Sequence, residues 1–169
     1  HLGLMPANEA AAAEARIAAI AGIVAGQVDI ERLLQVTATD KPLKPAMVPA
    51  TPAEQAAVRI GIARDPAFGF YYADDLEAFR DCGAELVPVD TLRDRSLPEV
   101  DGLFIGGGFP EVLGAELAAN AGFRASLRQG IEDGLPVYAE CGGLMYLARS
   151  LSWRGHTWEM VGAIPADVV

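Results

Sequence analysis

The residue types best suited to covalent chemistry in this chain surround Cys141. The sequence YAECGGLM, residues 138–145, places a cysteine and two glycines between an apolar strand pattern and a helix pattern. This order is typical of a nucleophile elbow, in which the reactive residue stands on a tight, strained turn between small neighbours. N–H groups at the start of the following helix would stabilise a thiolate. A structural cysteine at a strand end is the alternative, and the two glycines argue against it.

A second glycine-rich segment is GGGFPE, residues 106–111. Consecutive glycines let backbone N–H groups approach a ligand closely, so this loop and the N–H of Gly142 form a candidate oxyanion hole beside the cysteine. A phosphate-binding loop and a plain flexible turn are the alternatives. The phosphate-binding alternative is weakened because the chain has neither the Lys-Ser/Thr of a P-loop nor a G-x-G-x-x-G pattern.

The other residues that could take part in binding or catalysis form less specific patterns. The segment RDPAFGFYY, residues 64–72, holds four aromatic residues that would line a substrate surface, contact another domain or cover a sheet, with Asp65 capping the next turn. Cys82 lies at the end of a helix pattern and is predicted to be a small buried thiol. A cysteine hydrolase also needs a base. His156 follows in a predicted hairpin and His1 is terminal, so neither histidine is favoured as that base.

The elements that would position these residues alternate between strands and helices from residue 58 onward. Short apolar runs separated by helix patterns predict an α/β fold with a mostly parallel sheet and helices on both faces, in three layers. Function in such sheets lies at the carboxyl ends of the strands. The expected strands are 59–63, 85–89, 102–105 and 136–139, and the expected helices are 72–82, 111–119, 122–134 and 142–150.

The N-terminal part has a different character. Residues 5–35 are predicted to be helical, with an N-cap at Asn8 and a second short helix over 30–35. Residues 41–52 contain four prolines, which predicts a semi-rigid linker. We therefore divide the chain into a helical tail (1–40), a proline-rich linker (41–57) and an α/β domain (58–169).

Composition limits the classes of function. The chain has 169 residues, is 51% hydrophobic and carries a formal net charge of −10. This size supports one sizeable core, and the negative charge gives no electrostatic reason to bind nucleic acid or an anionic membrane. No apolar run approaches the roughly 20 residues of a membrane span, and no secretory signal is evident. We expect a cytoplasmic protein with two free thiols.

Three segments resemble the cobyrinic acid a,c-diamide synthase family, also called hydrogenobyrinic acid a,c-diamide synthases. They are the aromatic segment (64–72), the glycine segment (106–111) and the cysteine segment (138–145). The resemblance implies a class I glutamine amidotransferase-like domain that is truncated at its C-terminus. The opening HLGL, residues 1–4, resembles the end of the family's upstream ATP-binding synthetase domain. The implied activity is ATP-dependent amidation of the a and c side-chain carboxylates of a corrinoid in cobalamin biosynthesis, with ammonia released from glutamine.

The resemblance also implies the roles of individual residues. Cys141 would attack the glutamine carboxamide and form a thioester, while N–H groups at Gly107, Gly108 and Gly142 would hold the oxyanion. Related amidotransferases commonly have glycine two residues before the cysteine, where this chain has Ala139; alanine is small enough for the turn.

Further expectations concern ligands and partners. Phe109 and Glu140 are predicted to contact the substrate, and no metal site or cofactor is expected in this chain, because ATP and Mg²⁺ would bind the upstream domain. Glutamine and a corrinoid are the expected partners, without nucleic acid or membrane, in a possible homodimer. The family's catalytic histidine is expected downstream of Val169, so we expect the chain alone to be inactive.

Several alternatives stay open at this point. Within the same class, the chain would belong to a nickel-sirohydrochlorin a,c-diamide synthase or a cobyric acid synthase. A non-catalytic interface domain with the amidotransferase fold is a second possibility. A cysteine peptidase or deglycase with the same elbow is a third.

Overall fold

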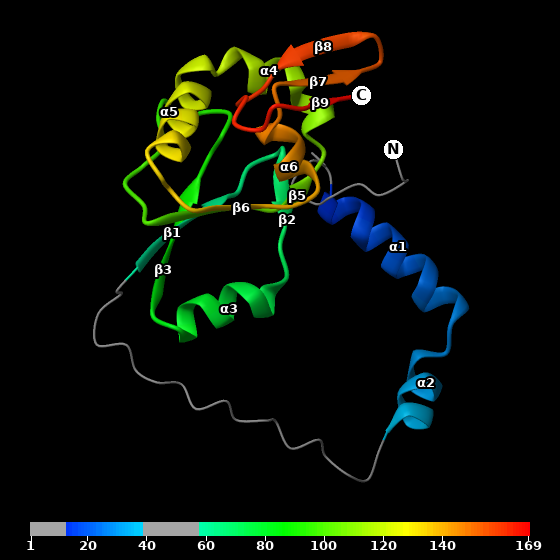
Figure 1. Ribbon diagram of the computed structural model, residues 1–169. Helices are drawn as coiled ribbons and strands as arrows, with labels where there is room; N and C mark the ends of the chain where they lie inside the picture. Colours follow the sequence, from blue (N-terminus) through cyan, green and yellow to red (C-terminus); the bar gives the residue numbers. More distant parts are fainter. Residues whose placement is uncertain (1–12, 39–57) are drawn as a thin grey trace. The chain divides into compact units, whose positions relative to one another are not determined.

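The computed structural model describes residues 13–38 and 58–169 (Figure 1). The chain separates into two compact units, residues 1–49 and 50–169, and each is described by itself. The predicted N-cap at Asn8 and the predicted linker at 41–57 lie outside the described residues.

The described part of the first unit consists of two helices, α1 (Ala13–Gln27) and α2 (Ile30–Thr37). The helix α1 continues through its glycines without a break. Asp29 begins α2, where its side chain accepts a hydrogen bond from the Arg32 N–H at 2.8 Å and so satisfies one of the free amides of the first turn. The predicted second helix is thereby confirmed.

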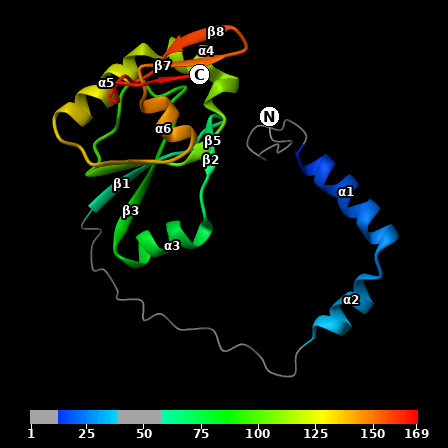
Figure 2. The same ribbon diagram turned by 45° about the vertical axis from the view of Figure 1, so that its right-hand side comes forward.

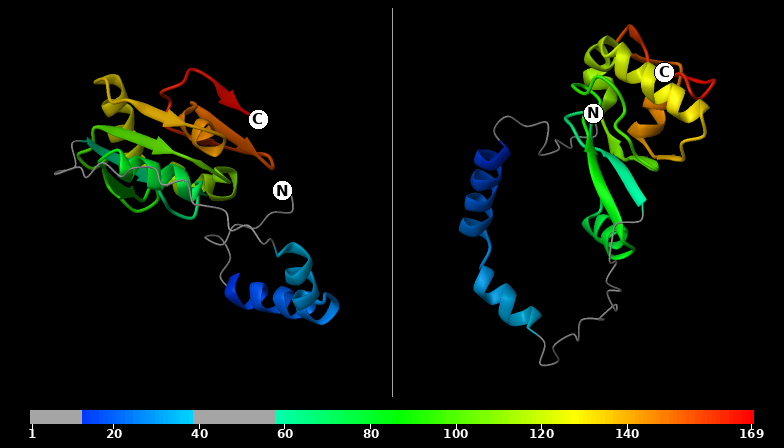
Figure 3. Two further views of the ribbon diagram at one scale, coloured as in Figure 1. Left: turned by 90° about the horizontal axis from the view of Figure 1, so that it is seen from below. Right: turned by 90° about the vertical axis from the view of Figure 1, so that its left-hand side faces the viewer.

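The second unit is built on a four-stranded parallel sheet, as the alternating sequence pattern predicted. Its strand order is β3-β1-β4-β6. The helix α3 (Ala73–Asp81) covers one face, while α5 (Ala121–Glu132) and α6 (Gly142–Leu147) lie on the other (Figure 1 and Figure 2). The right-hand view of Figure 3 shows the same separation of α3 from α5 by the strands. The strands are β1 (Val58–Ala63), β3 (Ala84–Val89), β4 (Gly102–Ile105) and β6 (Val137–Ala139).

Two small sheets complete the unit. The strand β2 (Phe68–Phe70) pairs in antiparallel fashion with β5 (Gly107–Gly108), so the aromatic and glycine segments lie side by side. The second sheet has the order β8-β7-β9. Its strands are β7 (Ser150–Trp153), β8 (His156–Glu159) and β9 (Asp167–Val168), and β7 and β8 form the predicted hairpin around His156.

Some predicted boundaries were wrong. The helix predicted over 142–150 ends at Leu147, because the backbone of the next residues pairs with a distant segment: Arg149 N–H donates to the carbonyl of Ala166 at 2.8 Å, and Met160 N–H donates to the carbonyl of Arg149 at 2.9 Å. The helix predicted over 111–119 is a 3₁₀ turn, η1 (Pro110–Leu113), followed by α4 (Gly114–Ala119).

The core lies between the sheet and the α5/α6 layer. Its fully buried side chains include Phe68, Ile105, Phe123, Leu127 and Tyr146. The opposite face is less well covered, since α3 has no buried residue.

This uneven coverage explains one wrong prediction. Cys82, expected to be a buried thiol, is exposed at the C-terminal end of α3, where the chain turns at Gly83. Cys82 and Cys141 are both free thiols.

Candidate active site

Cys141 stands on the tight turn that the sequence predicted between a strand and a helix. One residue, Glu140, separates Cys141 from the end of β6. Cys141 is the N-cap of α6, and its backbone angles are φ 50° and ψ −115°. These angles are close to those of the first central residue of a type II′ turn, where glycine is the usual residue. Among the described residues, only Cys141 and Arg154 have positive φ without being glycine. The Cys141 side chain is exposed.

Backbone hydrogen bonds join this turn to the end of β4. Gly143 N–H lies 2.8 Å from the carbonyl oxygen of Glu140 and 3.2 Å from that of Gly106. Glu140 N–H in turn donates to the carbonyl of Ile105 at 3.1 Å. The cysteine turn and the glycine loop are therefore one hydrogen-bonded unit.

The glycine loop also packs directly against the cysteine. A Cβ placed on Gly107 would lie 3.6 Å from the Cβ of Cys141, and one placed on Gly142 would lie 2.8 Å from the carbonyl oxygen of Gly108. The structure thus brings the three predicted oxyanion residues and the cysteine together. Gly142 N–H is the first amide of α6 and has no acceptor within the helix, which leaves it suited to bind an anionic oxygen.

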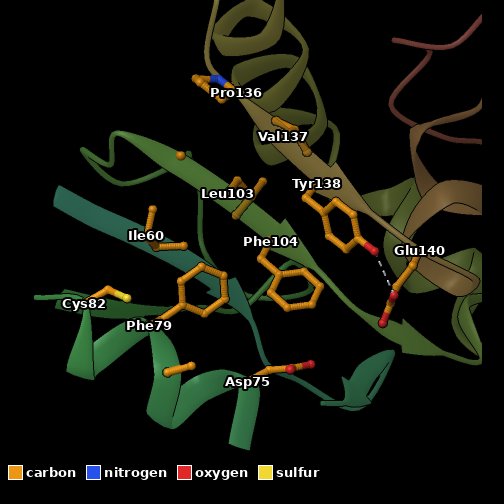
Figure 4. A pocket seen from close by; sticks show the side chains of 12 residues that line it. Ile60, Asp75, Phe79, Cys82, Leu103, Phe104, Pro136, Val137, Tyr138 and Glu140 are labelled. Carbon is orange, nitrogen blue, oxygen red and sulfur yellow. Dashed lines mark hydrogen bonds between the residues drawn. The ribbon is translucent and has the colours of Figure 1, made fainter. Parts of the chain in front are cut away.

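The two residues predicted to contact substrate adjoin this unit along the chain. Phe109 follows the glycines, and its ring packs edge-on against Phe70 with a centroid distance of 5.4 Å. Glu140 immediately precedes Cys141, and its carboxylate accepts a hydrogen bond from the Tyr138 hydroxyl at 3.2 Å. The Glu140 side chain points toward the sheet face that carries α3 (Figure 4).

An open groove of about 660 Å³ lies on that face, between α3 and the strands (Figure 4). Its walls are mainly apolar, and Asp75 and Glu140 are its acidic residues. Cys141 does not line it, so the groove adjoins the proposed nucleophile without containing it. The other lining residues are Ile60, Ala78, Phe79, Cys82, Gly102, Leu103, Phe104, Pro136, Val137 and Tyr138.

Comparison with known proteins decides the family. Residues 59–169 match the model of the CobB/CobQ-like glutamine amidotransferase domain. The chain belongs to this family. That finding confirms the resemblance drawn from the glycine, aromatic and cysteine segments.

Similar proteins carry a more specific name. The chain is 43% identical to a cobyrinate a,c-diamide synthase of Magnetococcus marinus, over 99% of its own length and 37% of that protein. It is 41% identical to one of Listeria innocua (96% and 36%) and 40% identical to one of Methanosarcina barkeri (100% and 39%). The chain thus spans well under half the length of these relatives. A crystal structure of a glutamine amidotransferase aligns over 64% of this chain and 54% of its own, with 22% identity and a TM-score of 0.47.

The first part of the aromatic segment of this amidotransferase domain is held by Asp65, which is buried. One carboxylate oxygen accepts hydrogen bonds from the N–H groups of Ala67 and Phe68, at 2.8 and 3.1 Å. The other accepts bonds from the N–H and hydroxyl of Thr91, both at 2.7 Å. Burial raises the pKa of Asp65 above its ordinary value, against the opposing effect of these hydrogen bonds. Asp65 therefore caps its turn, as predicted, and also fixes the turn to the end of β3.

No base for the cysteine is evident in the described part of the domain. His156 is exposed in the β7–β8 hairpin, and its ring stacks on Trp158 with a centroid distance of 5.8 Å. His1 lies outside the described residues. Within residues 13–38 and 58–169, no group of three or more His, Cys, Asp and Glu side chains is arranged to hold a metal ion, and no helix there is long and apolar enough to cross a membrane.

Proposed function

We propose that this chain supplies the glutamine-hydrolysing site of an ATP-dependent cobyrinate a,c-diamide synthase, with Cys141 as its nucleophile. The observation that carries the proposal is the strained turn at Cys141, with φ 50°, packed against a glycine loop in a member of a glutamine amidotransferase family. The names of the similar proteins support the choice of substrate.

The proposed reaction begins with the Cys141 thiolate, which attacks the carboxamide carbon of glutamine. The carbonyl π electrons move to oxygen, and the resulting oxyanion accepts hydrogen bonds from Gly142 N–H and from N–H groups at Gly107 and Gly108. The C–N bond then breaks, the nitrogen takes up a proton and leaves as ammonia, and a thioester remains. Water attacks the thioester, releases glutamate and restores the thiol. The proton transfers need a base and acid, for which we propose a histidine downstream of Val169.

The ammonia would then amidate the a and c carboxylates of the corrinoid. We propose that ATP and Mg²⁺, which would activate those carboxylates, bind the upstream synthetase domain. Phe109 and Glu140 are proposed contacts of the glutamine substrate, since Phe109 directly follows the glycine loop and Glu140 directly precedes Cys141 in the chain. A cytoplasmic location and a homodimer stay predictions.

Substitution of Cys141 tests the proposal in the full-length protein. Cys141→Ala should abolish amidation supported by glutamine and preserve amidation supported by added ammonia, because ammonia bypasses the thioester. Cys82→Ala is the matched control: this thiol is also exposed but lies at the end of α3, so both activities should be kept.

A glutamine analogue with a diazo-ketone group provides a direct readout. It should label Cys141 and leave Cys82 unmodified, whereas iodoacetamide should alkylate both exposed thiols. Loss of both activities in Cys141→Ala would mean that the residue is structural. Labelling of neither thiol by the analogue, with normal alkylation by iodoacetamide, would favour a non-catalytic domain. A panel of tetrapyrrole acids then separates cobyrinate from nickel-sirohydrochlorin and cobyric acid substrates.

A further inference from the structure

The hydroxyl of Tyr71 lies at the point where two central strands separate. The parallel register of β1 and β4 ends at the pair Ile62–Phe104. Beyond it, the chain after β4 turns toward β2 and forms the glycine loop. The Tyr71 hydroxyl accepts a hydrogen bond from Gly106 N–H at 3.0 Å and donates one to the carbonyl of Ala63, the last residue of β1. A single oxygen therefore bridges the two strand ends.

The hydroxyl is well suited to this bridge. It has one proton to donate and lone pairs to accept, which matches a carbonyl on one side and an amide on the other. Burial raises the pKa of Tyr71 to about 12, so the proton stays in place at neutral pH. The ring packs edge-on against Phe104, with a centroid distance of 5.0 Å, and this contact fixes where the hydroxyl points.

The Tyr71 side chain fits beside position 106 only because the residue there is glycine and has no Cβ. A Cβ at that position would lie 2.6 Å from the carbonyl oxygen of Phe70 and 2.7 Å from the ring of Tyr71. The carbonyl of Gly106 accepts the Gly143 N–H at 3.2 Å. A continuous set of contacts therefore leads from Tyr71 through Gly106 to the cysteine turn, and Gly106 is joined directly to Gly107.

We propose that Tyr71 is a positioning residue for catalysis, which fixes the glycine loop so that its N–H groups face the oxyanion formed at Cys141. This inference rests on the proposed function, because the oxyanion belongs to the glutaminase reaction. Donors that are already oriented stabilise a developing charge without having to reorganise. Displacement of such donors by about 1 Å is enough to lower a rate substantially. Tyr71 itself touches neither the substrate nor the thiol in this scheme.

The test is Tyr71→Phe in the full-length protein, with Tyr146→Phe as the matched control. Both tyrosines are largely or fully buried, but the Tyr146 hydroxyl has no hydrogen-bond partner among the described residues. For Tyr71→Phe we expect kcat for glutamine hydrolysis to fall about 10- to 100-fold, somewhat less than for removal of one oxyanion donor. KM should change less than about threefold, because the substrate contacts are intact. Tyr146→Phe should stay within about twofold of the wild type.

Two further measurements separate positioning from general damage. Alkylation of Cys141 by iodoacetamide forms no oxyanion, so its rate should stay within about twofold of wild type in Tyr71→Phe. Exchange of the Gly106 amide hydrogen should become faster, since its acceptor is gone. Unchanged kcat in Tyr71→Phe, or a fall matched by Tyr146→Phe, would overturn the inference.

Failure of the proposed function would be seen in the wild-type protein, whereas failure of the Tyr71 inference would be seen only in the variants. If the wild-type protein does not hydrolyse glutamine, the proposed function fails, and the role of Tyr71 in catalysis fails with it. Exchange at Gly106 then still decides whether the hydroxyl holds the loop.

Discussion

Replacing Cys141 by glycine and, separately, by alanine isolates the backbone strain at the proposed nucleophile. Both variants lack the thiol, so their stabilities differ only through the Cβ. At φ 50° and ψ −115°, that atom crowds the backbone in the folded state, and glycine has no such atom. The alanine variant retains the strain of the native turn and the glycine variant releases it.

The expected magnitude follows from two opposing terms. Strain at an unfavourable backbone conformation costs about 1–3 kcal/mol. Glycine also gives the unfolded chain more freedom than alanine, which lowers stability by about 0.4–1 kcal/mol. The Cys141→Gly variant should therefore be more stable than Cys141→Ala by roughly 1 kcal/mol.

Leu144 supplies the matched control three residues later in α6. It is exposed, with 52% of its surface accessible, and it has ordinary helical surroundings. In a helix interior, glycine is less stable than alanine by about 1 kcal/mol. The order of the two variants should therefore be reversed between positions 141 and 144.

Urea unfolding followed by the fluorescence of Trp153 and Trp158 measures all four variants. Both tryptophans belong to the α/β unit, in the hairpin that follows α6, and the comparison requires equal m-values. If glycine destabilises position 141 as it does position 144, the backbone at Cys141 is not strained and the residue does not stand on a nucleophile elbow.

Two other predictions concern stability and charge. Gly143→Ala would place a Cβ 2.3 Å from the backbone oxygen of Ile105, so we expect urea unfolding to show that the free energy of unfolding falls by about 2 kcal/mol or more. Gly130→Ala is the control, because its added Cβ meets the flexible Leu97 side chain. A smaller loss of stability in Gly143→Ala than in Gly130→Ala would contradict this prediction. The hydrogen bonds from Arg149 and Ser150 lower the pKa of Asp167 below its ordinary 3.8, so its contribution to stability is present above pH about 4 and is lost as pH falls through the folded pKa. Arg149→Met should raise the Asp167 pKa in an NMR titration, and an unchanged value would exclude the ion pair as its cause.

The local sequence was sufficient to predict the main elements of the α/β unit. Apolar runs of four to six residues have few alternatives to buried strands when glycine, proline or helix patterns separate them. The turn at Cys141 was equally local, because the two glycines after the cysteine remove the side chains that would block it. The carboxyl ends of parallel strands meet at one edge, which is why the sequence could place the cysteine and the glycine loop together.

Long-range pairing decided what the sequence could not. The glycines at 107 and 108 became strand β5 because the aromatic segment pairs with them, and glycines carry no alternating side-chain pattern to reveal it. Tyr71 was one of four adjacent aromatic residues, with nothing in its neighbours to single it out. Its hydroxyl gained a role only when Ala63 and Gly106, 43 residues apart in numbering, were brought within reach of one oxygen.

Cys82 shows that local sequence does not determine whether a side chain is buried. Its sequence setting, a helix end before glycine, fitted a buried thiol, but burial depends on what covers a helix and not on the helix itself. The sequence by itself thus determined the four strands of the main sheet, the approximate positions of the helices and the strained turn at Cys141, since these depend mainly on neighbouring residues. The tertiary structure decided which side chains meet around that turn and which remain exposed, because both depend on contacts between residues that are distant along the chain.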